Sequence, residues 1–437
     1  MKHVIGIRRE DKNEWEKRVP LIPEDVRQLG QKHRIEFVVQ PSPIRIFTDD
    51  EYRQAGAAIA EDLSSCSMVL AVKEIPQDLF QEGKTYIFFS HTIKGQEYNM
   101  PMLKRMMELK CHLIDYERIV DEHGRRLIFF GNYAGYAGMI DTLWSLGQRL
   151  KWEAAANPFE AVKHTYTYKN LEDAERAIKE VGENITKNGL PTGITPIIIG
   201  FAGYGNVSNA AQEIVDLLPT IEIRPDEIAE ICTSKKGDVN HVYKVVFTEQ
   251  DMVQPKHADT TFELQDYYDH PEKYVPNMET YLPYLGVLVN GSYWENKYPR
   301  ILTNAYAKAM YAPGNIPMLK VIGDISCDIE GAIECTVDST KPDKPAFVYD
   351  PATGQRTLGV EGRGPVIMAV DNLPCELARE SSSAFSYVLR EFIPEIIDAD
   401  FTKPLAESGL PEPVKHAVIL YHGELTEPYA YIEKFLQ

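Results

Sequence analysis

The stretch ITPIIIGFAGYGNVSNAAQEIVDLL, residues 194–218, decides the fold class of this sequence. Its apolar run at 197–199 is typical of a buried strand, and the pattern toward its end is typical of a helix. Between the two lies a Gly-x-Gly-x-x-Ser turn made by Gly203, Gly205 and Ser208. A turn of this kind between a strand and a helix predicts a dinucleotide-binding site. The alternative is a tight turn without a ligand, and we favour the binding site.

Each part of the turn has a physical reason. Glycines let the backbone approach a pyrophosphate closely, and the start of the helix supplies amide donors and a favourable dipole. Ser208 is small enough to preserve the contact between helix and strand. The stretch therefore predicts an α/β domain that binds NAD or NADP.

The choice between NAD and NADP depends on the next predicted strand, TIEIRP, residues 220–225. An acidic side chain near the adenosine ribose favours NAD, and an arginine accepts the 2′-phosphate of NADP. Glu222 and Arg224 are two positions apart and so share one face of the strand. We place both among the cofactor-binding residues; the pair favours NADP and leaves NAD open.

Strands and helices alternate through the first third of the chain. The predicted strands are 3–10, 35–40, 67–74, 85–91 and 111–119, and one of the helices between them is predicted at 52–63. This alternation predicts a parallel α/β sheet. A Gly- and Ala-rich segment at 131–150 then predicts a connecting helix whose small residues allow close packing.

Two predicted strands end in side chains that can transfer protons. VLAVKE ends near Lys73, and TYIFFSHTIKG, residues 85–95, delivers His91. Carboxyl ends of strands in open α/β sheets are where such folds bind ligands, so both side chains are expected to face one cleft. A later strand delivers Asp324, which is either functional or a helix cap.

Composition narrows the classes of partner. The 437 residues include 46 basic and 65 acidic ones, giving a net charge of −19, which disfavours nucleic acid and anionic membranes as partners. No apolar run is long enough to cross a bilayer, and the start lacks the apolar stretch of a signal peptide, so we expect a cytoplasmic protein. The six cysteines form no C-x-x-C pair, so neither a metal site nor a disulfide framework is predicted.

Several long motifs, in order, resemble the lysine–2-oxoglutarate reductase family, also called saccharopine dehydrogenase (lysine-forming), within the alanine dehydrogenase and transhydrogenase superfamily. The motifs are IGIRREDKNEWEKRVPLIPEDV, VKEIP, FFSHTIKGQEYNMPML, LIDYERIVDEHGRRLIFFGNYAGYAGMID, GYGNVS, GDISCDIEGAIE and VEGRGPVIMAVDNLPCELARESS. The likeness runs from the start of the chain to near residue 383. It implies reductive condensation of L-lysine with 2-oxoglutarate to saccharopine, or the reverse, through an imine and hydride transfer.

The resemblance also implies roles for individual residues. It implies an acid–base pair made by Lys73 and His91. It implies substrate-binding side chains and a cofactor turn, which are Arg18, Glu74, Glu117 and Arg126, and Gly203, Gly205, Asn206 and Val207. We also expect Asp324 and Asn372 to bind the cofactor. The chemistry agrees, because histidine titrates near neutrality and arginine suits carboxylate substrates. A lysine can move protons at neutral pH only if burial or nearby positive charge lowers its pKa, and Arg18 could supply that charge.

The expected fold is two Rossmann-like α/β domains with a cofactor cleft between them. We expect a substrate domain at 1–140 that resembles the alanine dehydrogenase/transhydrogenase N-terminal domain, an NAD(P)-binding domain at 141–340, and a return to the substrate domain with a C-terminal tail at 341–437. The substrate domain is thus discontinuous. The expected partners are a small amino acid and a keto acid, and a homo-oligomer is left open.

Two rival functions stay open. One is an alanine dehydrogenase or another opine-type amino-acid dehydrogenase, since selection by side-chain length depends on pocket shape. The other is a catalytically silent NAD(P)-binding protein. Retention of both Lys73 and His91 argues against the silent protein, which needs neither side chain.

Overall fold

The computed structural model describes residues 3–233, 237–257 and 259–436, and the chain divides into two compact units. The first is Met1–Phe130 with Ala378–Gln437, and the second is Gly131–Leu377. The first unit is therefore discontinuous in sequence. The boundary expected at residue 140 falls inside a helix, α4 (Gly131–Trp152). The return expected after residue 340 is too early, because the chain first adds three more strands to the second sheet.

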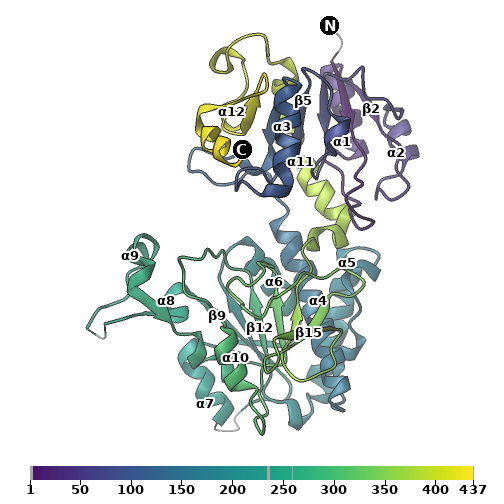
Figure 1. The fold of residues 1–437 in the computed structure, drawn as a ribbon. Helices are drawn as coiled ribbons and strands as arrows, with labels where there is room; N and C mark the ends of the chain where they lie inside the picture. Colours follow the sequence, from purple (N-terminus) through teal and green to yellow (C-terminus); the bar gives the residue numbers. More distant parts are fainter. Residues whose placement is uncertain (1–2, 234–236, 258, 437) are drawn as a thin grey trace. The chain divides into compact units, whose positions relative to one another are not determined.

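The first unit holds an eight-stranded sheet in the order β18-β17-β6-β5-β4-β1-β2-β3 (Figure 1). The strands from β6 to β3 pair in parallel, and β17 joins β6 antiparallel. The strands are β1 (Val4–Ile7), β2 (Glu36–Val39), β3 (Ala58–Ile59), β4 (Met68–Leu70), β5 (Thr85–Phe88), β6 (His112–Asp115), β17 (Val418–Tyr421) and β18 (Glu424–Leu425). The C-terminal tail thus completes this sheet.

The helices of the first unit are α1 (Pro23–His33), α2 (Asp49–Gln54), α3 (Met100–Glu108), α11 (Ala378–Asp398) and α12 (Glu412–Lys415). The helix predicted at 52–63 is wrong over most of its length. Gly56 adopts φ +95°, a left-handed conformation that ends α2 and turns the chain into β3. From the C-terminal part of the chain, Phe385 of α11 packs into this unit. Its ring stacks on Phe130 at 4.5 Å between ring centroids and lies edge-on to Tyr116 at 4.9 Å.

The second unit holds another eight-stranded sheet, in the order β15-β14-β16-β13-β12-β7-β9-β8. All strands from β16 to β8 are parallel, and the β14–β15 hairpin is antiparallel to them. The strands are β7 (Ile198–Ala202), β8 (Thr220–Glu222), β9 (Val242–Phe247), β12 (Val287–Asn290), β13 (Val321–Asp324), β14 (Ala346–Asp350), β15 (Gln355–Leu358) and β16 (Val366–Met368). A separate two-stranded sheet pairs β10 (Val253–Pro255) with β11 (Tyr274–Pro276). The expected α/β class is confirmed for both units.

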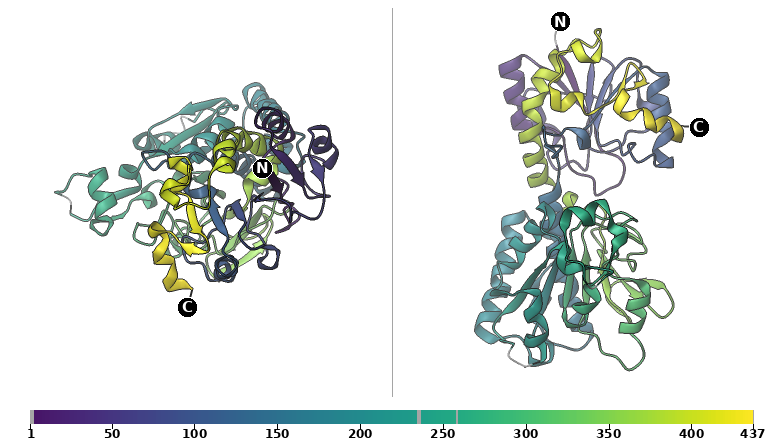
Figure 2. Two further views of the ribbon diagram at one scale, coloured as in Figure 1. Left: turned by 90° about the horizontal axis from the view of Figure 1, so that it is seen from above. Right: turned by 90° about the vertical axis from the view of Figure 1, so that its left-hand side faces the viewer.

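Helices cover both faces of the second sheet (Figure 2). They are α4, α5 (Leu171–Asn188), α6 (Asn206–Val215), α7 (Ile228–Thr233), α8 (Glu249–Met252), α9 (Leu264–Asp269) and α10 (Asn304–Met310). Alternate strand residues serve the two faces. Ile199 packs in the apolar cluster with α4, α5 and α6, while Ile198 packs in the cluster that contains residues of α7 and α10. Both faces of the central strands are thus covered by apolar clusters, as in parallel sheets generally.

Helices α4 and α6 approach closely through small side chains, as the Gly- and Ala-rich segment predicts. A Cβ on Gly135 would lie 2.2 Å from the carbonyl oxygen of Val207 and 2.7 Å from Cβ of Ala210. Only glycine fits this contact. It holds α6, which follows the glycine-rich turn, against the connecting helix.

The described residues contain neither a membrane-spanning helix nor a cluster of metal-ligating side chains. None of their helices is long and apolar enough to cross a membrane. No group of three or more His, Cys, Asp or Glu side chains in the same part of the chain could hold a metal ion.

We expect Gly135→Ala to lower the free energy of unfolding of the second unit by about 1–2 kcal/mol. Overpacking costs about 1–3 kcal/mol, which exceeds the gain of up to about 1 kcal/mol from replacing glycine by alanine in a helix. Urea unfolding followed by circular dichroism measures the change. Gly193→Ala is the control, since a Cβ there meets no atom within 4 Å. Equal or greater stability of Gly135→Ala would contradict the close approach.

Candidate active site

The glycine-rich turn lies where β7 meets α6 in the second unit. Gly203 has φ +95°, and its amide donates to the carbonyl of Phe247 at 3.2 Å. Gly205 is the N-cap of α6, and the hydroxyl of Ser208 donates to the carbonyl of Gly203 at 2.6 Å. Serine in the third position of the motif therefore stabilises the turn by a hydrogen bond, and it is also small enough for helix α6 to pack closely on strand β7.

The turn fits the pyrophosphate of a dinucleotide. A Cβ on Gly205 would meet no atom within 4 Å, so the backbone there borders open space that a ligand can enter. Asn206 and Val207 form the first turn of α6. Amides of a first helical turn lack partners within the helix and attract anions.

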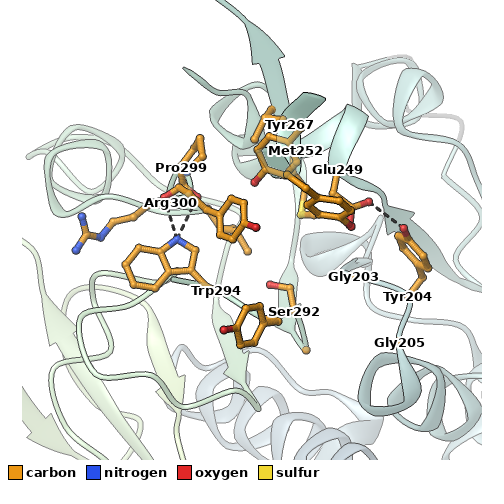
Figure 3. A pocket seen from close by; sticks show the side chains of 16 residues that line it. Gly203, Tyr204, Gly205, Glu249, Met252, Tyr267, Ser292, Trp294, Pro299 and Arg300 are labelled. Carbon is orange, nitrogen blue, oxygen red and sulfur yellow. Dashed lines mark hydrogen bonds between the residues drawn. The ribbon is translucent and has the colours of Figure 1, made fainter. Parts of the chain in front are cut away.

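A pocket of about 480 Å³ opens beside the turn (Figure 3). Its walls come from the turn itself, from the segment after β9, and from the segment after β12: Gly203, Tyr204, Gly205, Glu249, Met252, Val253, Tyr267, Tyr268, Gly291, Ser292, Tyr293, Trp294, Tyr298, Pro299, Arg300 and Ile301. Strand β7 lies between β9 and β12, so the pocket is at the point where the strand order reverses. Open α/β sheets bind their ligands at this point.

Glu222 and Arg224 do not reach this pocket among its described lining residues. The chain passes from α6 to the sheet edge, so β9, not β8, is the neighbour of β7. The cofactor roles of Glu222 and Arg224 stay predictions. Glu222 pairs with Lys244 at 3.1 Å. Arg224 is 69% exposed and pairs with Asp226 at 3.0 Å.

Asp324 ends β13 and belongs to a buried network. It accepts hydrogen bonds from the Asn290 amide at 2.9 Å and the Thr336 hydroxyl at 2.5 Å. Burial raises the pKa of Asp324 to about 6 despite these hydrogen bonds. Asn372 is buried just before the short helix Leu373–Leu377. Neither residue is among those that line the pocket, so their cofactor roles stay predictions.

The first unit gathers the predicted catalytic side chains at one edge of its sheet. Lys73 and Glu74 follow β4, His91 follows β5, and Glu117 follows β6. These strands are parallel neighbours, so their carboxyl ends meet at the same edge. Arg18 lies in the segment between β1 and α1.

Glu74 and His91 form a hydrogen-bonded pair, with Nδ1 of His91 2.7 Å from Oε1 of Glu74. Lys12 donates to both carboxylate oxygens at 2.9 and 3.1 Å. Burial alone would raise the pKa of Glu74, but the hydrogen bond and charge of His91, with the hydrogen bond from Lys12, lower it to about 2. Because this carboxylate is ionised, Nδ1 of His91 is the donor, and Nε2 carries the lone pair whenever the ring is neutral.

Lys73 sits beside a second buried carboxylate that the sequence reading missed. Both oxygens of Glu10 accept backbone amides, from Val72 at 2.6 Å and from Lys73 at 3.0 Å. Burial, with the charge of Glu16, raises the pKa of Glu10 to about 7. Burial and the charge of Arg18 lower the pKa of Lys73, whose ammonium makes no ion pair with any described residue. The expected effect of Arg18 on Lys73 is thus present, second to burial.

Arg18 forms an ion pair with Glu16, a residue that the sequence analysis did not predict to belong to the site. Its Nε and Nη2 donate to the two Glu16 oxygens at 2.8 and 2.6 Å, and both side chains are buried. The guanidinium lies 4.2 Å from the centre of the Phe130 ring. Arg126 forms an ion pair with Glu117 and is 52% exposed. Arg126 is therefore the more accessible of the two expected substrate arginines.

The chain resembles known proteins over its whole length. Residues 6–137 match the family described as alanine dehydrogenase/PNT, N-terminal domain. Alpha-aminoadipic semialdehyde synthase of Arabidopsis thaliana is 40% identical over 99% of this chain and 41% of its own length. The mitochondrial protein of that name from Bos taurus is 37% identical over 99% of this chain and 48% of its length. The chain is homologous to alpha-aminoadipic semialdehyde synthase.

This chain spans less than half the length of these two relatives. The saccharopine dehydrogenase [NAD(+), L-lysine-forming] of Neurospora crassa is 27% identical, covering 88% of this chain and 89% of its own. Among solved structures, an L-alanine dehydrogenase superposes with a TM-score of 0.62 at 16% identity, covering 99% of this chain and 100% of its own, which shows a shared fold. The resemblance expected from the motifs is confirmed. The cytoplasmic location stays a prediction.

The lowered pKa of Glu74 stabilises the fold at neutral pH, and this contribution is lost as the pH falls from 4.5 toward about 2. We expect the difference in unfolding free energy between wild type and Glu74→Gln to shrink by about 2 kcal/mol between about pH 6 and about pH 3. Urea unfolding at both pH values measures it. Glu122→Gln, at an 87% exposed side chain, is the control. A difference that does not change with pH would refute the assigned pKa.

Proposed function

We propose that the chain catalyses the NAD(P)H-dependent condensation of L-lysine with 2-oxoglutarate to saccharopine, or the reverse reaction. The observation that carries the proposal is the Glu74–His91 hydrogen bond beside a half-buried Lys73 whose pKa is lowered. The similarity to alpha-aminoadipic semialdehyde synthase and to saccharopine dehydrogenase supports the substrate class, and the glycine-rich turn supports the cofactor.

Each side chain has a task in this reaction. The Nε2 lone pair of His91 accepts a proton from the lysine amine as its nitrogen attacks the keto carbon. The Lys73 ammonium, whose pKa burial lowers, donates a proton to the keto oxygen, which becomes the hydroxyl of the carbinolamine. The protonated His91 then gives its proton to that hydroxyl, which leaves as water as the imine forms. Bound NAD(P)H supplies the hydride that reduces the imine carbon.

Glu74 and Arg126 act by position and charge. Glu74 fixes the orientation and tautomer of His91, as a carboxylate partner does for histidine bases generally. Arg126 offers a forked donor that suits a substrate carboxylate, with Glu117 holding it in place. This assignment keeps the roles expected from the resemblance.

The first test measures oxidation of NADH and of NADPH by purified protein with 2-oxoglutarate and lysine, ornithine or ammonia in parallel. We expect turnover only when lysine and 2-oxoglutarate are both present. Turnover with ammonia and pyruvate instead would identify an alanine dehydrogenase. Nucleotide binding without turnover on any pair would identify a silent binding protein.

We expect Lys73→Met and His91→Gln each to lower kcat/KM at least about 100-fold, the usual contribution of acid–base catalysis. The dissociation constant for the nucleotide should not change, because the glycine-rich turn belongs to the other unit. Steady-state kinetics and fluorescence titration measure the two quantities. Lys94→Met and His123→Gln, both at exposed positions, are the matched controls. Full activity of either catalytic variant would refute its role.

We expect Arg126→Gln to raise KM for 2-oxoglutarate about 10-fold, because one forked contact to a carboxylate is lost. Arg125→Gln is the matched control: Arg125 is the preceding residue, is 75% exposed and pairs with Asp121. Initial rates over a range of 2-oxoglutarate concentrations measure both variants. If the two variants behave alike, Arg126 has no specific contact with the substrate.

A further inference from the structure

The loop that carries His91 has an unusual backbone; we call residues 90–95 the His91 loop. His91 has φ +50°, a left-handed conformation that residues with a Cβ rarely adopt, and Gly95 at the end of the loop has φ +65°. A residue keeps such a conformation only where the surrounding structure imposes it, and such residues are frequent at functional sites. The contacts of the loop therefore decide where the His91 side chain lies.

The first part of the loop is held by the sheet of the first unit. The amide and the hydroxyl of Ser90 donate to Oδ2 of Asp115, at the end of β6, at 3.0 and 2.5 Å. The hydroxyls of Ser90 and Thr92 are 2.8 Å apart, and the side-chain amide of Asn99 donates to the carbonyl of His91 at 3.2 Å. These contacts fix the first three residues of the loop.

The last part of the loop contacts the C-terminal segment, Glu427–Phe435, which lies beside α3 (Figure 1). The hydroxyl of Tyr431 donates to the carbonyl of Ile93 at 2.8 Å. The ring of Phe435 lies so close to Gly95 that a Cβ on this glycine would be 2.3 Å from Cδ2 of the ring. The C-terminal segment thus holds the last part of the loop at two points.

The C-terminal segment is itself anchored in the first unit. Tyr429 and Ile432 are buried, and the Tyr429 hydroxyl donates to the carbonyl of His416 at 2.6 Å. The same hydroxyl accepts a hydrogen bond from Nε of Arg118 at 3.0 Å. Arg118 is the neighbour of Glu117, so the segment contacts the chain after β6 as well as the loop after β5.

Tyr431 and Phe435 differ from these anchors, because they are 47% and 38% exposed. Substitutions at exposed positions change stability little, so the contacts with the His91 loop are the main interactions that their substitution removes. Without these contacts the end of the loop can relax. His91 can then leave the conformation in which its Nδ1 lies 2.7 Å from Glu74.

We propose that the C-terminal segment positions His91 for proton transfer by holding the His91 loop through Tyr431 and Phe435. The assignment rests on the proposed function, in which His91 is the base. Tyr431 and Phe435 are positioning residues, because they act on the backbone of the loop. The tail of the chain, which completes the sheet, thereby also serves the catalytic histidine.

Steady-state kinetics of Tyr431→Phe and Phe435→Ala with lysine, 2-oxoglutarate and reduced nucleotide test the assignment. We expect kcat to fall at least about 5-fold in Tyr431→Phe and at least about 10-fold in Phe435→Ala, because a small displacement of a catalytic group slows the reaction strongly. KM for 2-oxoglutarate should change less than about 2-fold, since Arg126 keeps its place. Urea unfolding should give the wild-type midpoint for both variants.

Two further variants control for general effects of substitution. Phe435→Tyr keeps the ring against Gly95 and should restore the kcat that Phe435→Ala loses. Tyr387→Phe removes a hydroxyl from an exposed tyrosine of α11 and should keep the wild-type kcat. Tyr431→Phe, which removes one oxygen atom, serves as the second variant if Phe435→Ala fails to fold.

The decisive comparison repeats Tyr431→Phe and Phe435→Ala in the His91→Gln variant. If the segment acts through His91, each substitution should change the residual kcat of His91→Gln less than about 2-fold, because effects that share one path do not add. Losses as large in His91→Gln as in the wild type would overturn the proposal. Wild-type kcat in both single variants would overturn it as well.

The same measurements separate this proposal from the proposed function. Turnover with ammonia and pyruvate in place of lysine and 2-oxoglutarate, with the same losses in the variants, would overturn the proposed function and leave the positioning role intact. Turnover with lysine and 2-oxoglutarate that is equal in the wild type and both variants would do the reverse. Absence of turnover on any pair would overturn both.

Discussion

Parallel pairing of strands is the constraint on which both candidate sites depend. In a parallel sheet, all carboxyl ends lie at one edge, so side chains far apart in sequence meet there. In the first unit, this pairing brings Glu74 at the end of β4 to 2.7 Å from His91 at the end of β5. In the second, it sets Glu249 beside the Gly203 turn. The chemistry of each edge is then decided by which loops follow the strands.

Buried charge shapes the first of these edges. Two carboxylates there have opposite pKa shifts: burial raises that of Glu10, while His91 and Lys12 lower that of Glu74. The difference follows from their partners: among the described residues, Glu10 accepts hydrogen bonds from backbone amides, whereas Glu74 accepts them from the side chains of Lys12 and His91. Lys73 lies next to both, which leaves a lysine of lowered pKa beside an ionised carboxylate. Separation of pKa values in neighbouring groups is a common property of acid–base sites.

Much of this was predictable from sequence, and the failures have physical causes. The strand-and-helix alternation predicted both sheets, and strand ends predicted Lys73 and His91 at one edge. Gly56 ended a predicted helix, since one left-handed residue overrides a helical pattern. The place of β8 at the edge of the sheet could not be predicted, because chain order does not reveal strand order. Glu10 and Glu16 were missed because their partners are brought together only by tertiary packing.

The pairing of β6 with β17 joins residues about 300 positions apart, such as Ile114 and Val418. The core of the first unit is likewise incomplete without Phe385, whose ring packs against both Phe130 and Tyr116. The second unit is continuous and can fold as soon as it leaves the ribosome, whereas the first must stay incomplete until the second has been made. The unit that carries the acid–base residues is thus completed last, and until then the edge of its sheet at β6 lacks the partner strand β17.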